Sequence, residues 1–303
     1  MNIFLENVDL QSNTGPNYFA QKLISYMTNF GCIFNQPDIK PDVQLCFIES
    51  KNRYFNNIPL LQRLDGIYFN INFDCDRMNS NIKRTYESSD GVIFQTEFNK
   101  NLIFKWFGPH DNYTIINNGA DEVAISSIKY DNEFPFLENF ENVWTCASHW
   151  HVYKRLEDNI KYFLEFSGEK DCLVIAGSNP DYVIESPRVF YVGNLSTKNL
   201  LSLFKKSKYF IHLAYLDHCP NVVLDARACG CEIICSSSGG TKEIAGHGAI
   251  LLEEPEWDYT LIKSKTPPKM CYNNKIKNRY DSDTSMLKTA KKYYKFFKKA
   301  LSA

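Results

Sequence analysis

The chain has 303 residues, of which 44% are hydrophobic and 15% aromatic, and its formal net charge is -1. This length predicts two domains, and the composition excludes an intrinsically disordered chain because enough apolar side chains are present to form sizeable cores. The balanced charge gives no overall field that would attract nucleic acid or an anionic membrane, so either partner would need a local basic patch.

The cysteines and the N-terminus indicate the cellular compartment. Ten cysteines are scattered along the chain, mostly within apolar runs, which favours buried reduced thiols over a disulfide framework. The opening MNIFLENVD lacks the cation and long apolar stretch of a signal peptide, and no apolar run approaches the ~20 residues of a membrane span. We expect a soluble, cytoplasmic protein that binds no nucleic acid.

The first half of the chain alternates short apolar runs with amphipathic segments, a pattern typical of β-α-β units on a parallel sheet. Strands are expected at residues 2–8, 32–34, 43–49, 58–64, 91–96 and 113–118. Helices are expected at 17–30, 81–89 and 97–108, the first with Phe19, Leu23, Tyr26 and Met27 on one face. We assign residues 1–140 to an N-terminal Rossmann-like domain.

The alternation is lost over residues 121–142, which we interpret as the crossing between domains, and then resumes. Strands are expected at 143–148, 172–177, 188–193, 209–214, 232–237 and 249–254. Helices are expected at 155–167, at 196–207 with Ser196 as N-cap, at 222–228 and at 240–246. Residues 141–280 thus form a second α/β domain of Rossmann type, and a ligand would bind at the carboxyl ends of the strands, in a cleft where the two domains face each other.

Three loops at strand ends have residues suited to binding. The first, SNTGPNYF, follows the first strand; Gly15 permits close backbone approach, and the helix after Pro16 offers unpaired amides to an anion. The alternative is an ordinary turn.

The second loop, SHWHVYKRL, places Lys154 and Arg155 where a strand passes into a helix, a position suited to cations that face phosphate. His149 and His151 flank a tryptophan, but their spacing and surroundings do not predict a metal site. The alternative is a solvated surface pair, which we favour for Arg155.

The third loop reads DHCPNVVLDARACGC. Pro220 and Asn221 suit a helix start and Gly230 its end, so Asp225 falls about one turn into the helix and Asp217 lies in the preceding loop. Carboxylates there would accept hydrogen bonds from vicinal hydroxyls while the helix amides bind an anion, a combination that fits a sugar nucleotide. Alternatively, Asp217 is a turn residue and Asp225 a favourable charge near a helix start.

The stretch FIHLAYLDHCPNVVLDARACGCEIICSSSGGTKEI resembles the donor-site signature of glycosyltransferase family 4, the retaining enzymes of GT-B fold. That signature has two glutamates separated by seven residues, then Ala-x-Ala-x-Gly, an apolar strand and Gly-Gly-x-x-Glu. Asp217 and Asp225 occupy the two glutamate positions, and Gly239, Gly240 and Glu243 match the later part. The likeness extends over most of the chain up to about residue 254.

The resemblance implies roles on the donor side. Asp225 would hold the ribose hydroxyls and Asp217 the hydroxyls of the transferred sugar. Lys154 would neutralise the diphosphate leaving group. The backbone facing the sugar and phosphate would be that of Cys219, Pro220, Asn221 and Val222.

In the N-terminal domain the resemblance implies that the loop of Gly15 and Pro16 closes on the donor. Asp65 matches a place where relatives often keep a polar residue of the catalytic cleft, commonly histidine. It would contact the sugar or orient the acceptor.

Two departures from the family pattern stand out. Both glutamates are replaced by aspartates, each one methylene shorter. The arginine that precedes the lysine is absent, and His149, Trp150 and His151 stand there instead. A histidine would then supply the second donor to phosphate, with Arg155 as a further candidate.

The implied function is retaining transfer of a sugar from a nucleoside diphosphate donor to a hydroxyl of a glycan, a lipid-linked or another acceptor. No metal or other cofactor is required, because the lysine and the helix end can stabilise the leaving group. Two alternatives stay open: a donor-binding module without activity, and a retaining glycoside hydrolase, which also needs two carboxylates.

Two further features have competing interpretations. Cys219, Cys229, Cys231 and Cys235 with His218 could suggest zinc, but their spacing is not a familiar pattern, and small core thiols explain them better.

Residues 281–303 predict an amphipathic helix with Leu287, Ala290, Tyr294, Phe297 and Leu301 on one side and lysines on the rest. We favour packing back towards the N-terminal domain, with peripheral membrane contact through the lysines as the alternative.

Overall fold

The computed structural model describes residues 1–128 and 133–302, and the chain divides into two compact units. The first unit comprises Met1–Gly119, Trp257–Lys265 and Ser285–Ala303; the second comprises Ala120–Glu256 and Thr266–Thr284. The boundary expected after residue 140 therefore lies at Gly119/Ala120. The segment 121–142, expected to cross between domains, belongs to the second unit, except that residues 129–132 lie outside the described residues.

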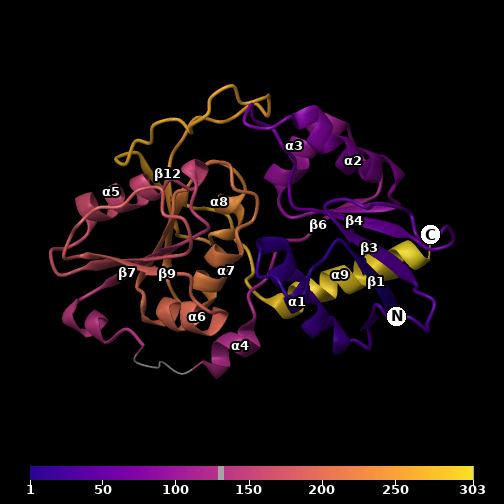
Figure 1. Ribbon diagram of the computed structural model, residues 1–303, viewed down its shortest axis with the longest axis horizontal. Helices are drawn as coiled ribbons and strands as arrows, with labels where there is room; N and C mark the ends of the chain where they lie inside the picture. Colours follow the sequence, from indigo (N-terminus) through magenta and orange to yellow (C-terminus); the bar gives the residue numbers. More distant parts are fainter. Residues whose placement is uncertain (129–132, 303) are drawn as a thin grey trace. The chain divides into compact units, whose positions relative to one another are not determined.

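The first unit is built on a parallel sheet in the order β2-β1-β3-β4-β5-β6 (Figure 1). Its strands are β1 (Asn2–Glu6), β2 (Ile33–Phe34), β3 (Val43–Phe47), β4 (Leu60–Leu64), β5 (Gly91–Phe94) and β6 (Tyr113–Ile115). Its helices are α1 (Gly15–Thr28), α2 (Cys75–Ser88), α3 (Glu97–Phe107) and α9 (Met286–Leu301). All five residues of β3 and of β4 are buried, as a sheet covered on both faces requires.

Helices α1 and α9 pack together in the core on one face of this sheet, where α9 (yellow) lies beside α1 (indigo) in Figure 1. Phe19, Leu23, Tyr26 and Met27 of α1 are buried, which confirms the predicted face. α2 and α3 contribute to a separate core that includes residues of β4 and β5.

The buried side of α9 agrees with the expected one only at Ala290 and Phe297. Its buried residues are Met286, Thr289, Ala290, Tyr293, Phe296 and Phe297. Leu287 and Leu301, expected on the apolar face, are 37% and 41% exposed. Tyr293 faces inward because its hydroxyl accepts a hydrogen bond from Arg63 Nε at 3.1 Å, a partner that a helical wheel does not show.

The start of α9 depends on a close backbone approach. A Cβ atom at Gly119 would lie 2.6 Å from the Cα atom of Met286, so no larger residue fits at position 119.

The segment Trp257–Lys265 follows the second unit in the sequence but belongs to the first. Two hydrogen bonds hold it there: Ile262 N donates to Phe69 O at 2.9 Å, and Trp106 Nε1 donates to Tyr259 O at 2.8 Å.

The second unit has a sheet in the order β13-β12-β11-β10-β7-β8-β9, parallel except for β13. Its strands are β7 (Val143–Ala147), β8 (Cys172–Ala176), β9 (Val189–Gly193), β10 (Tyr209–His212), β11 (Glu232–Ser236), β12 (Ile250–Leu252) and β13 (Lys275–Lys277). Its helices are α4 (Glu122–Ser127), α5 (Leu156–Phe166), α6 (Thr197–Lys206), α7 (Asn221–Ala228) and α8 (Thr241–Ile244), with 3-10 turns η1 (Pro135–Asn139) and η2 (Val152–Lys154).

Helix starts in this unit follow from local capping. The side chain of Ser196 accepts a hydrogen bond from Asn199 N at 3.2 Å, which confirms the predicted N-cap of α6. Helix α7 begins at Asn221 after Pro220 and is followed by Gly230 at φ 99°, as the sequence predicts.

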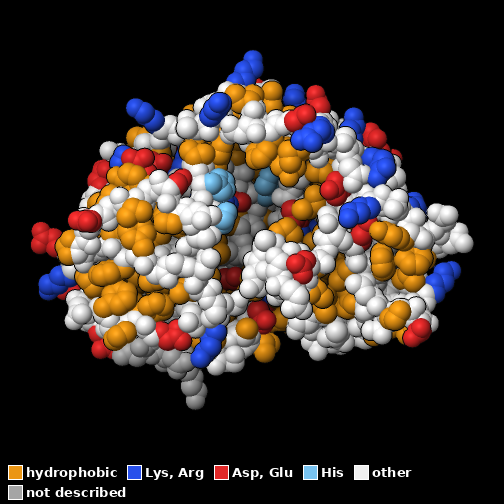
Figure 2. Space-filling model, viewed as in Figure 1, with side chains coloured by type: hydrophobic (Ala, Val, Ile, Leu, Met, Phe, Trp, Pro, Cys, Tyr) orange, Lys and Arg blue, Asp and Glu red, His pale blue; other side chains and the backbone are white. Residues whose placement is uncertain are grey.

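Charged side chains of both signs are interspersed on the face of the molecule that Figure 2 shows. Among the helices that the structure describes, none is long and apolar enough to cross a membrane.

Candidate functional site

The predicted donor-binding loops of the second unit lie at the carboxyl ends of two neighbouring strands. β7 is followed by the loop with Lys154, and β10, which pairs with β7, is followed by the loop with Asp217. Lys154 closes the 3-10 turn η2, and Asp217 lies four residues before α7. Parallel strands bring their following loops to one edge of the sheet, so residues 63 positions apart in sequence meet there.

Lys154 and Asp217 form a direct ion pair. Lys154 Nζ lies 2.5 Å from Asp217 Oδ2, and the two side chains are 23% and 15% exposed. Asp217 Oδ1 accepts a hydrogen bond from the backbone amide of His218 at 3.0 Å. The sequence predicted both residues for the site, and the structure brings them into contact.

His212, the last residue of β10, is a further partner of this carboxylate. Its Nε2 atom lies 2.9 Å from Asp217 Oδ2, and the side chain is 5% exposed. Burial by itself raises the pKa of the Asp217 carboxyl, but the Lys154 ammonium and the His212 hydrogen bond outweigh it and hold that pKa well below its usual range. Asp217 is therefore a carboxylate at neutral pH, ready to accept hydrogen bonds.

Gly239 and Gly240, the glycine pair that the sequence singled out, contact the main chain of Asp217. Gly240 N donates to Asp217 O at 2.8 Å. Gly239 has φ +72°, and a Cβ atom there would lie 2.6 Å from Asp217 O. Only glycine allows this approach of two backbones, so Gly239 and Gly240 fix the loop through the main chain.

Asp225 lies one turn into α7 (Asn221–Ala228), after the backbone segment Cys219 to Val222 that the sequence predicted to face the donor. Its side chain is almost enclosed, with 4% of the residue exposed. Cys219 is also buried, and Val223 and Leu224 of α7 belong to the core. The helix start is therefore held rigidly by its apolar side.

Arg155 corrects an expectation. The sequence favoured a solvated surface residue, but Arg155 is 3% exposed and adopts a left-handed conformation with φ 53°. Its guanidinium forms a two-point ion pair with Glu254, with NH1 at 2.9 Å from Oε2 and NH2 at 2.7 Å from Oε1. A guanidinium that forms two hydrogen bonds with a buried carboxylate stabilises the fold, so Arg155 has a structural role beside the Lys154 loop.

The two histidines before Lys154 lie on either side of an anchored tryptophan. Trp150 is 4% exposed, and its Nε1 atom donates to Ala176 O at 3.0 Å. His149 and His151 are both exposed. His149 Nδ1 lies 2.6 Å from Ser178 Oγ, and the ring centroids of His151 and Tyr153 are 6.5 Å apart.

The predicted residues of the first unit also lie at the carboxyl edge of their sheet. Asp65 directly follows β4, forms an ion pair with Arg63 and accepts a 2.6 Å hydrogen bond from Gln95 Nε2. Arg63 is 1% exposed, and its NH2 atom donates to Asn118 Oδ1 at 2.8 Å. This network fixes the Asp65 carboxylate.

Gly15 and Pro16 form the first turn of α1, after the loop that follows β1. Proline is tolerated there because the first helical amides have no intrahelical acceptor. The structure thus places these two residues and Asp65 at one sheet edge of the first unit.

Sequence reasoning missed His212 and Gln95. Both are polar residues at or just after the end of a buried strand, which is the signal that could have identified them. His212 was included in an expected strand but was given no role there.

The cysteines considered for zinc lie mostly in the core. Cys219, Cys231 and Cys235 are 5%, 6% and 0% exposed. Cys231 Sγ donates to Phe204 O at 3.1 Å, and burial raises the pKa of the Cys235 thiol to about 12. These are the properties of protonated core thiols.

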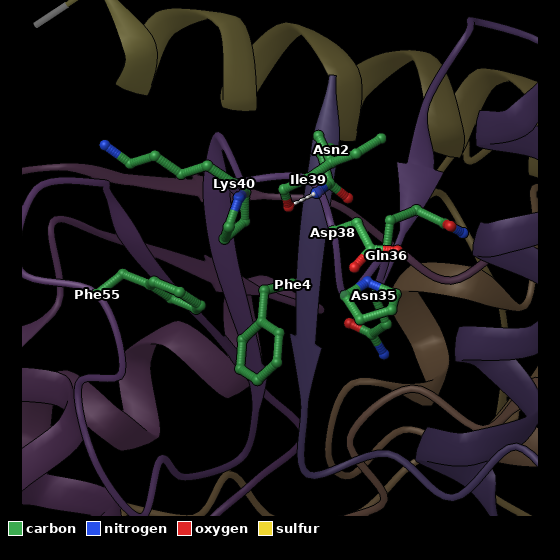
Figure 3. A pocket seen from close by; sticks show the side chains of 10 residues that line it. Asn2, Phe4, Asn35, Gln36, Asp38, Ile39, Lys40 and Phe55 are labelled. Carbon is green, nitrogen blue, oxygen red and sulfur yellow. Dashed lines mark hydrogen bonds between the residues drawn. The ribbon is translucent and has the colours of Figure 1, made fainter.

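A pocket of about 490 Å³ lies elsewhere in the first unit (Figure 3). Its lining comprises Asn2, Phe4, Asn35, Gln36, Pro37, Asp38, Ile39, Lys40, Pro41 and Phe55. Two side-chain amides of the lining already form hydrogen bonds within the protein: Asn2 Nδ2 donates to Ile39 O at 2.6 Å, and Asn35 Oδ1 accepts from Leu5 N at 2.7 Å. The lining includes no residue that the sequence predicted for the donor site.

Comparison with known protein families gives a match that lies mostly in the second unit. Residues 152–263 match the family model of glycosyl transferases group 1. This segment contains Lys154, Asp217, Asp225 and the glycine pair, so the match covers the predicted donor loops. Comparison with curated protein sequences gives no match.

Solved structures resemble the chain over nearly its whole length. A glycosyltransferase from Rickettsia africae has a TM-score of 0.68 at 12% identity, covering 99% of this chain and 98% of that one. A sucrose-phosphate synthase from Thermosynechococcus elongatus has a TM-score of 0.67 at 14% identity, covering 84% and 86%. HepE from Anabaena in complex with UDP-glucose has a TM-score of 0.62 at 14% identity, covering 99% and 92%. The fold is the α/β fold of GT-B glycosyltransferases, with two Rossmann-like units.

Proposed function

We propose that the protein is a retaining glycosyltransferase that moves a sugar from a nucleoside diphosphate donor to a hydroxyl of an acceptor. The observation that carries the proposal is the Lys154–Asp217 pair beside the start of α7, within the segment that matches the glycosyltransferase family model. A cation, a carboxylate and helix amides at one sheet edge are the groups that a sugar diphosphate requires.

In this proposal the leaving group is stabilised by charge. The bond between the anomeric carbon and the diphosphate breaks, and the negative charge that develops on the departing oxygen is met by Lys154 and by the backbone amides of Cys219, Asn221 and Val222. These groups supply the positive potential that a metal ion supplies elsewhere, so we propose a metal-independent reaction. His149 and His151 are candidates for a second phosphate contact.

The two carboxylates of the second unit would bind different parts of the donor. Asp225 would bind the ribose hydroxyls and Asp217 the hydroxyls of the transferred sugar. In the first unit, Asp65 and the Gly15–Pro16 loop would contact the sugar or the acceptor. HepE was crystallised with UDP-glucose, which makes a uridine diphosphate sugar the first donor to test.

The acceptor would be a glycan or a lipid-linked molecule, and we propose a cytoplasmic enzyme that contacts membranes through α9. The lysines at positions 288, 291, 292, 295, 298 and 299 are all exposed, and the helix sequence contains no acidic residue. The apolar side of α9 is used in the core, so this contact would be electrostatic.

A turnover assay tests the proposal. Donor sugars that bind the protein are incubated with a panel of glycan and lipid-linked acceptors, and NMR spectroscopy follows the anomeric configuration of the product. Transfer with retained configuration is the expected result. Binding without turnover across the panel would indicate a donor-binding module. Sugar release that needs no nucleotide and survives Asp225→Ala would indicate a glycoside hydrolase.

A further inference from the structure

We propose that His212 is a positioning residue of the donor site, which keeps the Asp217 carboxylate in place when Lys154 binds the diphosphate. This inference rests on the proposed function and adds a residue to it. The sequence signature contains no role for position 212.

The geometry places two donors on one oxygen. Asp217 Oδ2 is 2.5 Å from Lys154 Nζ and 2.9 Å from His212 Nε2, while Oδ1 accepts from His218 N. Diphosphate oxygens would compete with Asp217 for the ammonium of Lys154, because both are anions. Without His212, the carboxylate would then lose its side-chain donors on Oδ2 at the moment when it must meet the sugar.

The short side chain at position 217 makes this partnership specific. Aspartate is one methylene shorter than the glutamate of the family pattern, so its carboxylate stays close to the end of β10. His212 is the last residue of that strand and reaches the carboxylate from there. The 2.9 Å distance from Nε2 to Oδ2 shows that the imidazole and the aspartate are in direct contact there.

The surroundings of His212 fix its ring. The side chain is 5% exposed, and the ring stacks on Phe210 with centroids 6.3 Å apart and an interplanar angle of 12°. Burial lowers the pKa of this imidazole, against the opposing effect of Asp217. A neutral ring donates one hydrogen bond through Nε2 without adding a cation that competes for the phosphates.

The test separates sugar recognition from general damage. Calorimetry measures the Kd of a nucleoside diphosphate and of its glucose conjugate for the wild type, His212→Leu and His212→Gln, beginning with UDP and UDP-glucose and extending to the GDP, ADP and dTDP pairs. Glutamine places an amide donor near the position of Nε2, whereas leucine fills the space without one. His110→Leu, which removes a partly buried imidazole in the first unit, is the matched control.

We expect His212→Leu to weaken binding of the sugar conjugate about tenfold while leaving the parent diphosphate within about twofold, because losing one hydrogen bond to a charged group has this size. His212→Gln should recover most of the loss, and Asp217→Asn combined with His212→Leu should lose little more than Asp217→Asn alone. Equal weakening of both ligands, or no weakening, would overturn the positioning role while the proposed function stands. Failure of the wild type to bind any of the pairs would overturn both.

Discussion

Lys154 Nζ and Asp217 Oδ2 lie 2.5 Å apart at the ends of two hydrogen-bonded strands, although the residues are 63 positions apart in the sequence. The pair is mostly shielded from solvent, so each charge is stronger towards a ligand than it would be in water.

Lys154→Ala should reduce kcat/KM for sugar transfer by roughly 10²–10³, because a preorganised group that meets developing charge contributes about that much. Steady-state kinetics measures the effect. Lys161→Ala is the matched control, since Lys161 forms an exposed ion pair with Glu157 on α5. A Lys154→Ala variant with wild-type turnover would exclude leaving-group stabilisation by this lysine.

Asp225→Asn should weaken binding of a nucleoside diphosphate by about tenfold, because an amide accepts hydrogen bonds from ribose hydroxyls more weakly than a carboxylate. Calorimetry with the 2′,3′-dideoxy nucleotide supplies the control, since this ligand lacks both hydroxyls and should bind the variant and the wild type alike. An equal loss for both ligands would mean that Asp225 supports α7 and does not contact ribose.

Arg155→Leu should destabilise the second unit by about 3–5 kcal/mol, because it leaves the Glu254 carboxylate buried without its cation. Urea denaturation measures the free energy of unfolding. The double variant Arg155→Leu/Glu254→Leu should be less destabilised than the sum of the two single variants. Additive losses would show that the two charges are not coupled.

The stability of the protein should fall between pH 6.5 and pH 4, partly because of His218. Burial lowers the pKa of this imidazole from 6.5 to about 4 in the folded state. Below pH 6.5 the unfolded chain therefore binds a proton that the folded chain does not, and unfolding becomes more favourable as the pH falls. His218→Gln should make the pH dependence of the unfolding free energy shallower in this window, and an unchanged slope would contradict the lowered pKa of the His218 imidazole.

Reversing two charges on α9 should weaken membrane contact. Lys291→Glu/Lys295→Glu should lower partitioning onto vesicles of anionic phospholipid more than tenfold, because each lysine near such a surface contributes about 1 kcal/mol. Lys161→Glu/Lys170→Glu changes the net charge equally at exposed sites elsewhere and should have a smaller effect. Partitioning is measured by sedimentation with vesicles. If the two double variants partition equally, α9 is not the surface that contacts the membrane.

Most of the fold could be predicted because its signals are local. Most strands of both units are short apolar runs, and Ser196, Pro220 and Gly230 mark the start of α6 and the two ends of α7. The exposed strand β13 (Lys275–Lys277) has no such run and was not expected. The segment 121–142 could not be resolved in this way, since α4 and η1 are too short to show a helical period. The inward face of α9 depends on the Arg63 partner of Tyr293, which lies 230 positions away.

The candidate site could be predicted in part. Spacing within the β10–α7 loop placed Asp217 and Asp225 around a helix start, and the passage from strand to helix at Lys154 made it a candidate for phosphate contact. The surroundings of these residues are tertiary. Arg155 has the sequence of a surface cation but is buried against Glu254, and His212 acquires its neighbour only when the loop folds back over the strand end.

The most direct measurement is a thermal-shift titration with UDP-, GDP-, ADP- and dTDP-sugars on the wild type and on Lys154→Ala/Asp225→Asn. A ligand that binds only the folded state raises Tm, by an amount equivalent to about 2.7 kcal/mol at a concentration of 100 Kd. We predict that at least one nucleotide sugar raises the Tm of the wild type and that the double variant loses this shift while keeping its own fold. No shift with any donor, or an undiminished shift in the double variant, would contradict the assignment of the β10–α7 edge as a donor site.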